Sequence, residues 1–212
     1  MLFDLTALAA DVRYKLLTAT VTPRPIAWIT TRSREGIDNA APFSFFNVMG
    51  HEPATVAIGL LRNPRSGLKD TAHNILATGE FIAHLVPERM AAAMNATSAE
   101  VPAEVDELRA AGLRVVPGDM VAASRIADCP VAFECRAISS VVTGPDQVAV
   151  IAQVLCAHIA DAHILDAGRG HVDTPSLDLI SRMHGAGWYA RSTDLFELAR
   201  PQPASRQAEP VE

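Results

Sequence analysis

The sequence lacks the features that mark disulfide-rich, secreted or membrane proteins. Its 212 residues contain only three cysteines, Cys129, Cys135 and Cys156, an odd number without CxxC spacing. They stand in apolar runs typical of strands, so we expect buried free thiols in a reducing cytoplasm. No apolar run approaches the roughly 20 residues that a helix needs to span a bilayer. Asp4 stands where a secretory signal would carry positive charge, so the sequence favours a cytoplasmic protein without a membrane partner.

Basic residues are fewer than acidic residues, which argues against nucleic acids as partners. Lysine and arginine total 18 against 24 acidic residues, giving a formal net charge of −6. This balance favours solubility and argues against a nucleic acid held through its phosphates. The length suits one domain with its own core, which we place at residues 1–199, with a disordered tail at 200–212 because that stretch is rich in proline and polar residues.

Several catalytic motifs are also missing. The seven histidines form no HExxH or Cys/His ligand set, so we expect no metal site. No GxSxG elbow suggests a hydrolase, and residues 59–69 lack the GK[ST] ending of a phosphate-binding P-loop. Residues 185–190 formally fit GxGxxA, but no βαβ unit follows, so we reject a Rossmann site there.

The most informative stretch is residues 21–53. Pro23 and Pro25 flank Arg24, and a β-rich apolar run follows at residues 26–31. After a turn, residues 40–48 interleave phenylalanines with small polar side chains, and three of the seven phenylalanines fall within four positions. Aromatic side chains beside a hydroxyl and an amide suit a flat, partly polar ligand such as a flavin ring. The alternative, a hairpin whose phenylalanines fill the core, remains open on periodicity alone.

The rest of the chain predicts short strands with a few helices. We expect strands at residues 54–61, 80–86, 131–142, 147–160 and 163–165. Helices are expected from residue 68 to Gly79 and after Pro87, with a helical or irregular lead-in at residues 1–20. The acidic, alanine-rich residues 97–112 are interpreted as a solvated helical excursion. Together these elements predict a mainly β, antiparallel barrel with helical insertions.

Two segments carry basic residues where an anion could bind. A predicted helix begins with Lys69, Asp70 and Thr71. Its first backbone N–H groups, the Lys69 ammonium and the Thr71 hydroxyl would together hold a phosphate. Alternatively, Ser66 or Asp70 merely caps the helix and Lys69 points to water. Arg182 and His184 form a second basic pair beside two glycines, and either residue could instead be a surface charge.

Four segments in the same order resemble one known family. TVTPRPIAWITT, NAAPFSFFNVMG, KDTAHNI and RMHGAGWY, spread over about residues 14–190, are similar to the flavin reductase family of FMN-binding split barrels, which includes flavoredoxin-like proteins. The resemblance implies an antiparallel split β-barrel that binds FMN, with FAD as an alternative, and uses NADH or NADPH as electron donor. It also implies a homodimer and, for some members, a partner monooxygenase.

The resemblance further implies which residues contact the cofactor. They are Arg24, Pro25, Ser44, Phe45, Phe46, Asn47, Lys69, Thr71, Arg182 and His184. Because a flavin itself carries the hydride chemistry, no catalytic acid or nucleophile is required, and only His184 is named as a candidate for assisting transfer. The predicted function is therefore an NAD(P)H-dependent flavin reductase. An electron-carrier flavoprotein and a non-catalytic binding module on the same barrel remain alternatives.

Overall fold

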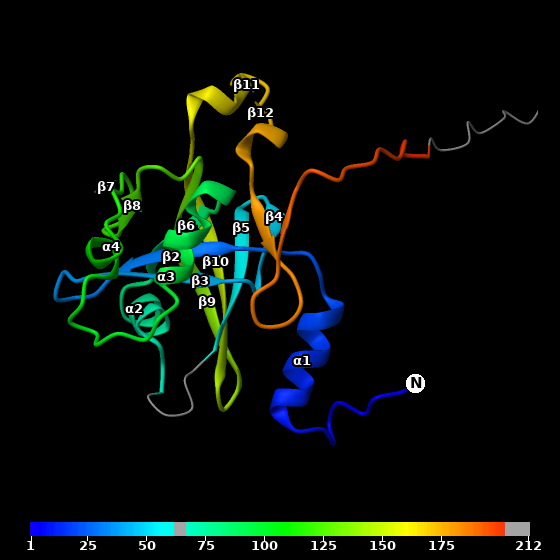
Figure 1. The fold of residues 1–212 in the computed structure, drawn as a ribbon. Helices are drawn as coiled ribbons and strands as arrows, with labels where there is room; N and C mark the ends of the chain where they lie inside the picture. Colours follow the sequence, from blue (N-terminus) through cyan, green and yellow to red (C-terminus); the bar gives the residue numbers. More distant parts are fainter. Residues whose placement is uncertain (62–66, 202–212) are drawn as a thin grey trace, which may run out of the picture.

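The protein is organised around one seven-stranded antiparallel sheet, shown in Figure 1 for the computed structural model, which describes residues 1–61 and 67–201. Across the sheet the strands run in the order β3-β2-β6-β9-β10-β5-β4. They are β2 (Ala27–Arg32), β3 (Asp38–Phe43), β4 (Phe46–His51), β5 (Ala54–Leu61), β6 (Glu80–Leu85), β9 (Val131–Gly144) and β10 (Gln147–Ile159). The long β9–β10 hairpin forms the middle of the sheet.

The remaining strands form three small antiparallel sheets. β13 (Ile180–Arg182) pairs with both β1 (Arg24–Pro25) and β14 (Tyr189–Arg191). β7 (Val115–Pro117) pairs with β8 (Ser124–Ile126), and β11 (Ile164–Asp166) pairs with β12 (His171–Val172). The first of these sheets brings a segment near the end of the chain against the start of the barrel.

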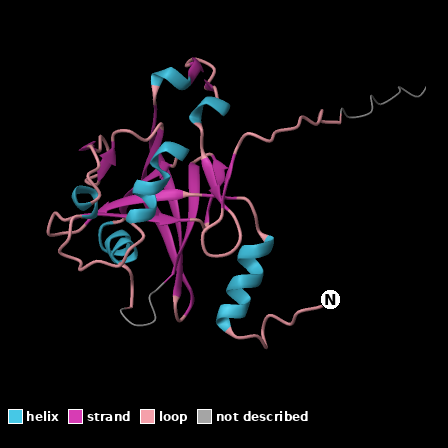
Figure 2. Ribbon diagram, viewed as in Figure 1, coloured by secondary structure: helices cyan, strands magenta, loops and turns pink. Residues whose placement is uncertain are grey.

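Helices surround the sheet rather than interrupt it (Figure 2). They are α1 (Ala10–Thr20), α2 (Asp70–Thr78), α3 (Ala91–Ala96) and α4 (Glu107–Ala110), with short 3-10 turns η1 (Glu88–Met90), η2 (Asp161–His163) and η3 (Pro175–Leu177). α2 ends where Gly79 adopts a left-handed backbone at φ 75° and donates its N–H to Ile75 O. Asn74 fixes α2 to the sheet by donating to Thr31 Oγ1 at 3.0 Å.

The sheet closes because its two outer strands are neighbours in the sequence. β3 ends at Phe43 and β4 begins at Phe46, so only Ser44 and Phe45 connect the two edges. The backbone N–H of Gly59 in β5 donates to Phe45 O at 2.7 Å and ties this connection to the wall of the barrel. A Cβ on Gly59 would lie 3.0 Å from Phe45 Cβ, so the glycine permits the close approach.

Two apolar clusters lie on opposite faces of the curled sheet. The interior of the barrel contains Ile29, Phe46, Ile58, Leu60 and Phe81, among others. The outer cluster lies beneath α3 and α4 and contains Trp28, Met94, Leu108 and Ile126. Because β2 is covered on both faces, its residues from Ala27 to Thr31 are all buried, which explains why the run at residues 26–31 shows no alternation. Trp28 donates its buried indole N–H to Thr97 Oγ1 at 2.9 Å.

Most of the expected strands are confirmed, and the differences have physical causes. The phenylalanine-rich residues 40–48 do not form one strand: they are divided between β3 and β4, because the chain bends at Ser44 and Phe45 to cross between sheet edges. The interpretation of residues 97–112 as a solvated helical excursion is wrong about the helix and about Leu108, whereas residues 98–104 are exposed as expected. Only one turn, α4, is helical there, and Leu108 is 1% exposed. β7, β8 and β12 were not anticipated. Ser66 and residues 202–212 of the expected disordered tail lie outside the described residues.

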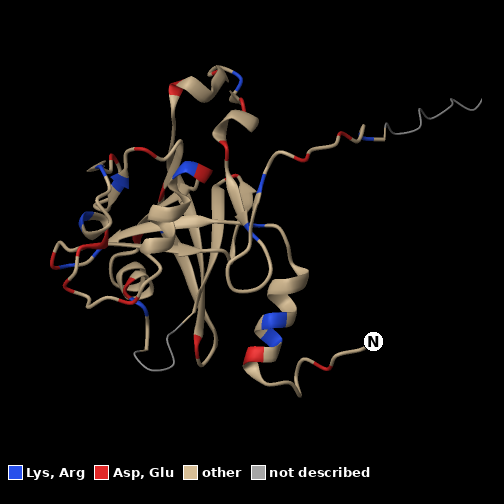
Figure 3. Cartoon of the chain, viewed as in Figure 1, with Lys and Arg blue, Asp and Glu red and all other residues tan. Residues whose placement is uncertain are grey.

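Charged residues lie mainly on the helices, loops and strand ends around the sheet (Figure 3). Over the described part of the chain, Figure 3 shows basic and acidic residues interspersed on these segments. No helix within residues 1–61 and 67–201 has the length and apolar character to cross a membrane.

His84 connects three strands inside the protein. Its ring is fully buried, with Nδ1 2.9 Å from Trp28 O and Nε2 accepting the N–H of Ile126 at 2.9 Å. Since Nε2 is an acceptor, the proton of the neutral ring is on Nδ1 and is donated to the Trp28 carbonyl. Burial lowers the pKa of His84 to about 4.

We expect this histidine to make folding sensitive to acid. In the unfolded chain the pKa of His84 is near the ordinary histidine value of 6.5, so the unfolded state takes up the proton first as pH falls. The free energy of unfolding is therefore highest above pH 6.5 and falls by roughly 3 kcal/mol as the pH is lowered from 6.5 to about 4. Urea unfolding at pH 7.5 and 4.5 measures this loss. His84→Gln should lose less stability between these two pH values than the unmodified protein. The control His51→Gln, at an exposed site, should lose as much as the unmodified protein. Equal losses in all three proteins would contradict the assignment.

Candidate cofactor-binding site

Three adjoining depressions surround the end of β3, and all three are lined by Pro42 and Phe43. We call their combined surface the Phe43 groove. One depression, of about 460 Å³, lies between β3, the start of α2 and residues 97–103. A second, of about 190 Å³, is lined by Tyr14, Ser44 and Lys69. The third, of about 260 Å³, extends towards β13 and β14. The groove thus combines apolar walls, hydroxyl groups and cations, as small-molecule sites do.

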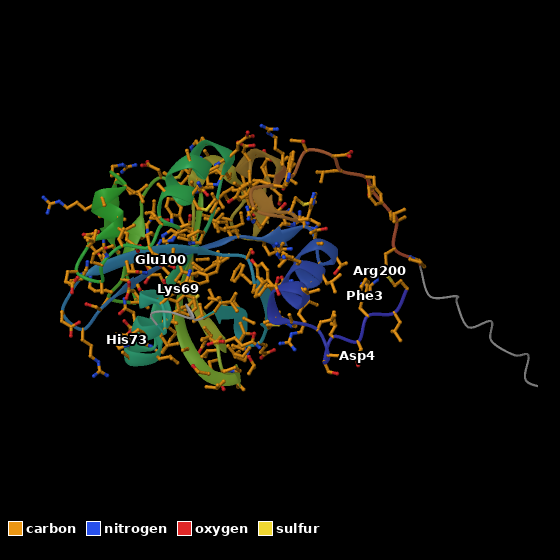
Figure 4. The ribbon with its side chains drawn as sticks, turned by 60° about the horizontal axis from the view of Figure 1, so that its bottom comes forward. Phe3, Asp4, Lys69, His73, Glu100 and Arg200 are labelled. Carbon is orange, nitrogen blue, oxygen red and sulfur yellow. The ribbon has the colours of Figure 1, made fainter. Side chains whose placement is uncertain are left out.

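One part of the groove is positively polarised by the start of α2. His73 N–H donates to Lys69 O as the first helical hydrogen bond, so the N–H groups before it have no intrahelical partner. Lys69 occupies the N-cap and makes no side-chain cap hydrogen bond. Its side chain and that of Glu100 lie on neighbouring segments that line the 460 Å³ depression (Figure 4). Partial positive charge from the helix and the Lys69 ammonium can attract an anion, although the carboxyl groups of Asp70, Glu100 and Glu107 line the same depression.

A buried polar network supports the start of α2. Thr71 is only 1% exposed, and its hydroxyl lies 2.8 Å from the amide of Asn39. Oriented to satisfy both neighbours, the Asn39 amide accepts from Thr71 and donates to Glu107 Oε2 at 2.9 Å. The same carboxyl oxygen accepts the N–H of Ala40 at 2.7 Å. Thr71 therefore contributes mainly by holding the helix start against β3.

Glu107 places an unusual carboxyl group in the groove. It lines the same 460 Å³ depression as Lys69 and Asp70. Burial raises the pKa of Glu107 to about 7, and the nearby Asp70 and Asp106 carboxylates act in the same direction. The charge of this side chain therefore changes near neutral pH, next to the anion-binding geometry.

The β13–β14 hairpin borders the groove with Arg182 and Tyr189. The Arg182 guanidinium lies over the Tyr189 ring at 4.8 Å and donates to Gly185 O at 3.2 Å. Both residues line the 260 Å³ depression with Tyr14 and Ser44. His184 stands outside this lining and stacks on the exposed Trp188, with ring centroids 6.2 Å apart.

Arg24 is buried and acts as an internal connector. Its guanidinium donates to Thr18 O at 2.7 Å, Val21 O at 2.6 Å and Met183 O at 3.0 Å. It also reaches Ser44 Oγ at 3.4 Å. One side chain thus joins α1, the β13–β14 hairpin and the connection between β3 and β4.

A separate apolar depression of about 450 Å³ lies on the other side of Ser44 and Phe45. Pro25, Asn47 and Met49 line it, together with Leu17 from α1. Phe46 is 7% exposed and belongs to the barrel core, so the alternative that phenylalanines fill the interior describes this residue.

The structure brings together half of the ten residues expected to contact a cofactor. Ser44, Phe45, Lys69, Thr71 and Arg182 line the Phe43 groove. The neighbouring apolar depression is lined by six of the ten, because Ser44 and Phe45 border it too, along with Arg24, Pro25, Phe46 and Asn47. His184 lies on the exposed hairpin.

Sequence reasoning missed other residues of the groove. Tyr14 reaches it from α1, with its ring 6.1 Å from that of Phe45, and Ser98 and Glu107 come from the stretch read as solvated. The large apolar residues of this stretch, Val101, Val105 and Leu108, were the signal that it packs against the barrel.

A curled antiparallel sheet of this topology, with a helix start at its rim, is a split β-barrel. Residues 19–174 match the family model described as flavin reductase like domain. The chain belongs to that family.

Sequence and structure comparisons agree with this assignment. An uncharacterized protein of Deinococcus radiodurans is 43% identical over 202 residues, covering 93% of this chain and 88% of the relative. The structure of nitrilotriacetate monooxygenase component B from Bacillus cereus superposes with a TM-score of 0.87 at 28% identity, covering 93% of this chain and 98% of that one. For 2-nitrobenzoate 2-nitroreductase from Pseudomonas fluorescens the TM-score is 0.85 at 29% identity, with 95% and 96% covered.

We expect loss of the Arg24 guanidinium to destabilise the fold and release the β13–β14 hairpin. Arg24→Met removes the donors of three carbonyl groups, and leaving buried polar groups unpaired costs about 1–3 kcal/mol each. The free energy of unfolding in urea should fall by at least about 2 kcal/mol, and limited proteolysis should cut faster near Met183. Arg13→Met, which removes the same charge from a partly exposed site with a single long carbonyl contact, is the control. Similar losses in both variants would show that the carbonyl contacts contribute little.

Proposed function

We propose that the protein binds FMN in the Phe43 groove and reduces it with NADH or NADPH. The observation that carries the proposal is the start of α2 with Lys69, which provides an anion site beside an aromatic and hydroxyl-lined wall. A phosphate-bearing flat ring needs these two features in one groove. FAD is an alternative ligand for the same groove.

The residues of the groove fit the parts of FMN. Lys69 and the N–H groups that begin α2 would hold the phosphate, and Arg182 offers a second cation across Phe43. Pro42, Phe43 and Tyr14 supply apolar surface that excludes water from a ring, and the Ser44 hydroxyl can orient it. When bound, the flavin supplies the redox chemistry by accepting a hydride. The protein contributes binding, orientation and electrostatics, and we assign no catalytic acid or nucleophile to the chain.

Relatives suggest where the electrons go. One similar structure is a component of nitrilotriacetate monooxygenase and another is a nitroreductase. We infer that this protein passes electrons to a partner monooxygenase through reduced flavin or to a small acceptor.

A homodimer is the assembly that we infer for the flavin reductase. Val48 and Met49 of β4 are 62% and 56% exposed, and Tyr14 and Leu17 of α1 are 51% and 48% exposed. These side chains border the 190 Å³ and 450 Å³ depressions or lie on the same elements. Exposed apolar surface of this kind is typical of interfaces. A second copy packed there would cover the apolar depression and approach the groove.

The direct test mixes the purified protein with FMN and then NADH or NADPH under anaerobic conditions. The proposal expects bleaching of oxidised flavin absorbance at a rate proportional to protein concentration. Tight FMN binding without turnover with either nucleotide would instead identify an electron carrier. Protein that binds neither FMN nor FAD at micromolar concentration would support the binding-module alternative.

We expect Lys69 to distinguish FMN from riboflavin, which lacks the phosphate. Lys69→Ala removes a charge-assisted contact worth about 1.5–3 kcal/mol, so FMN affinity should fall roughly 10- to 100-fold while riboflavin affinity stays unchanged. Fluorescence titration of both ligands measures the difference. Lys15→Ala, on the exposed side of α1, is the matched control. A parallel loss of both ligands in the Lys69 variant would place the phosphate elsewhere.

Glu107 should make FMN binding depend on pH. With a pKa of about 7, its carboxyl is ionised above neutrality and then opposes a phosphate at the start of α2. The phosphate itself titrates near pH 6. Affinity should therefore decrease as pH rises from about 6.5 to 8. In Glu107→Gln the curve should be flatter, with tighter binding at pH 8, while Glu104→Gln should behave as the unmodified protein. Identical curves for all three would exclude this role.

A further inference from the structure

A cluster of metal-binding side chains lies on the central hairpin, away from the Phe43 groove. Its position follows from a register shift in β10 between Val154 and Cys156. After the shift Cys156 pairs directly with Glu134 of β9, so both side chains project from the same face. His158 lies two positions further along the strand and shares that face. Because Cys135 points into the barrel core, this face is the outer one.

Three ligand atoms approach one nitrogen of His158. Nε2 lies 2.7 Å from Glu134 Oε1, 3.5 Å from Asp119 Oδ2 and 3.7 Å from Cys156 Sγ. The Glu134, Cys156 and His158 donor atoms all lie within 4.8 Å of one another. A single N–H can serve only one of these acceptors well, whereas an ion in their midst would bind all of them.

The geometry does not fit a catalytic thiol. A Cys–His–Glu relay uses different ring nitrogens toward the thiol and toward the carboxylate. Here both contacts are made by His158 Nε2. Burial and the neighbouring Glu134 also raise the pKa of the Cys156 thiol, which opposes nucleophilic activation.

The carboxylate of Glu134 is held in place before any ion binds. It is 0% exposed, and it accepts backbone N–H groups from Asp119 at 2.8 Å, Met120 at 2.6 Å and Val121 at 3.0 Å. These bonds fold residues 118–121 over the hairpin and bring the Asp119 side chain, 70% exposed, to the rim of the cluster. A Cβ on Gly118 would lie 2.6 Å from Val121 O, so this close fold requires glycine. The cluster is therefore preorganised on its buried side and open to solvent at Asp119.

We propose that Cys156, His158 and Glu134, with Asp119 at the rim, bind a zinc ion. Thiolate, imidazole and carboxylate together are a ligand set that favours this borderline-soft cation. Tetrahedral ligands at zinc bond lengths lie about 3.3–3.6 Å apart, close to the separations of His158 from Asp119 and from Cys156. The contact between His158 and Glu134 must lengthen by about 0.6 Å. Glu134 Oε2 keeps its backbone hydrogen bonds through that change.

Binding has a defined proton balance. The Cys156 S–H bond breaks, a sulfur–zinc bond forms and the proton passes to solvent. His158 must be neutral and carry its ring proton on Nδ1, so that the lone pair of Nε2 faces the ion; this change of tautomer releases no further proton. The bound ion would join residues 118–121 to β10, so its role is to fix this loop on the barrel. It takes no part in the proposed flavin chemistry.

The experiment uses the full chain without a polyhistidine tag, stripped of metal by EDTA. Titration with Zn²⁺ against a chromogenic chelator should show one equivalent bound, with affinity decreasing as pH falls. Cys156→Ser and His158→Gln should each weaken binding at least tenfold, since loss of even an outer partner costs about 10- to 100-fold. The controls Cys129→Ala and His163→Gln alter the same residue types elsewhere and should match the unmodified protein. Circular dichroism verifies that each variant is folded.

A second measurement needs no variant. Zn²⁺ should slow alkylation of Cys156 by iodoacetamide, followed by mass spectrometry, and leave the slow reaction of buried Cys129 and Cys135 unchanged. The proposal is overturned if the unmodified protein binds no zinc at micromolar concentration or if the Cys156 and His158 variants bind as tightly as it does. Alkylation of Cys156 at the same rate with and without zinc would also overturn it.

Discussion

The two-residue connection between β3 and β4 is the constraint on which the architecture depends. Because Ser44 and Phe45 join the outer strands of the sheet, the sheet must curl until its edges meet. This bend assigns opposite roles to the two flanking aromatic residues. Phe43 lines the groove at the rim, whereas Phe46 enters the barrel core. The wall of the groove that Pro42 and Phe43 form is therefore a consequence of closing the barrel.

The charged side chains near the rim of the barrel have two different roles. Arg24 satisfies backbone carbonyl groups from three segments, so its charge is used to hold the rim together. Lys69 and the start of α2 remain directed to the 460 Å³ depression, where Glu107 faces them. A helix start with a lysine, beside a carboxyl that loses its charge near neutral pH, is the part of this lining that suits a phosphate.

The sequence predicted the barrel well where local signals were strong. The run at residues 54–61, the β9–β10 hairpin and the helix ending at Gly79 all follow from short-range patterns. The break at Ser44 has no such signal, because closure depends on strands that are remote in the sequence. The burial of Leu108 and Glu107 likewise arises from packing of α4 against β3 and the outer cluster. Glu134 and His158 are 24 positions apart and meet only through strand register, so no motif search reveals their cluster.

The central claim is that FMN lies along Phe43 with its phosphate at the start of α2. A crystal structure of the protein with FMN tests it most directly. The account predicts the phosphate oxygens within hydrogen-bond distance of Lys69 Nζ and the first N–H groups of α2, with the ring against Pro42 and Phe43. Density for FMN in the apolar depression beside Pro25 and Met49, with the start of α2 free of ligand, would contradict it.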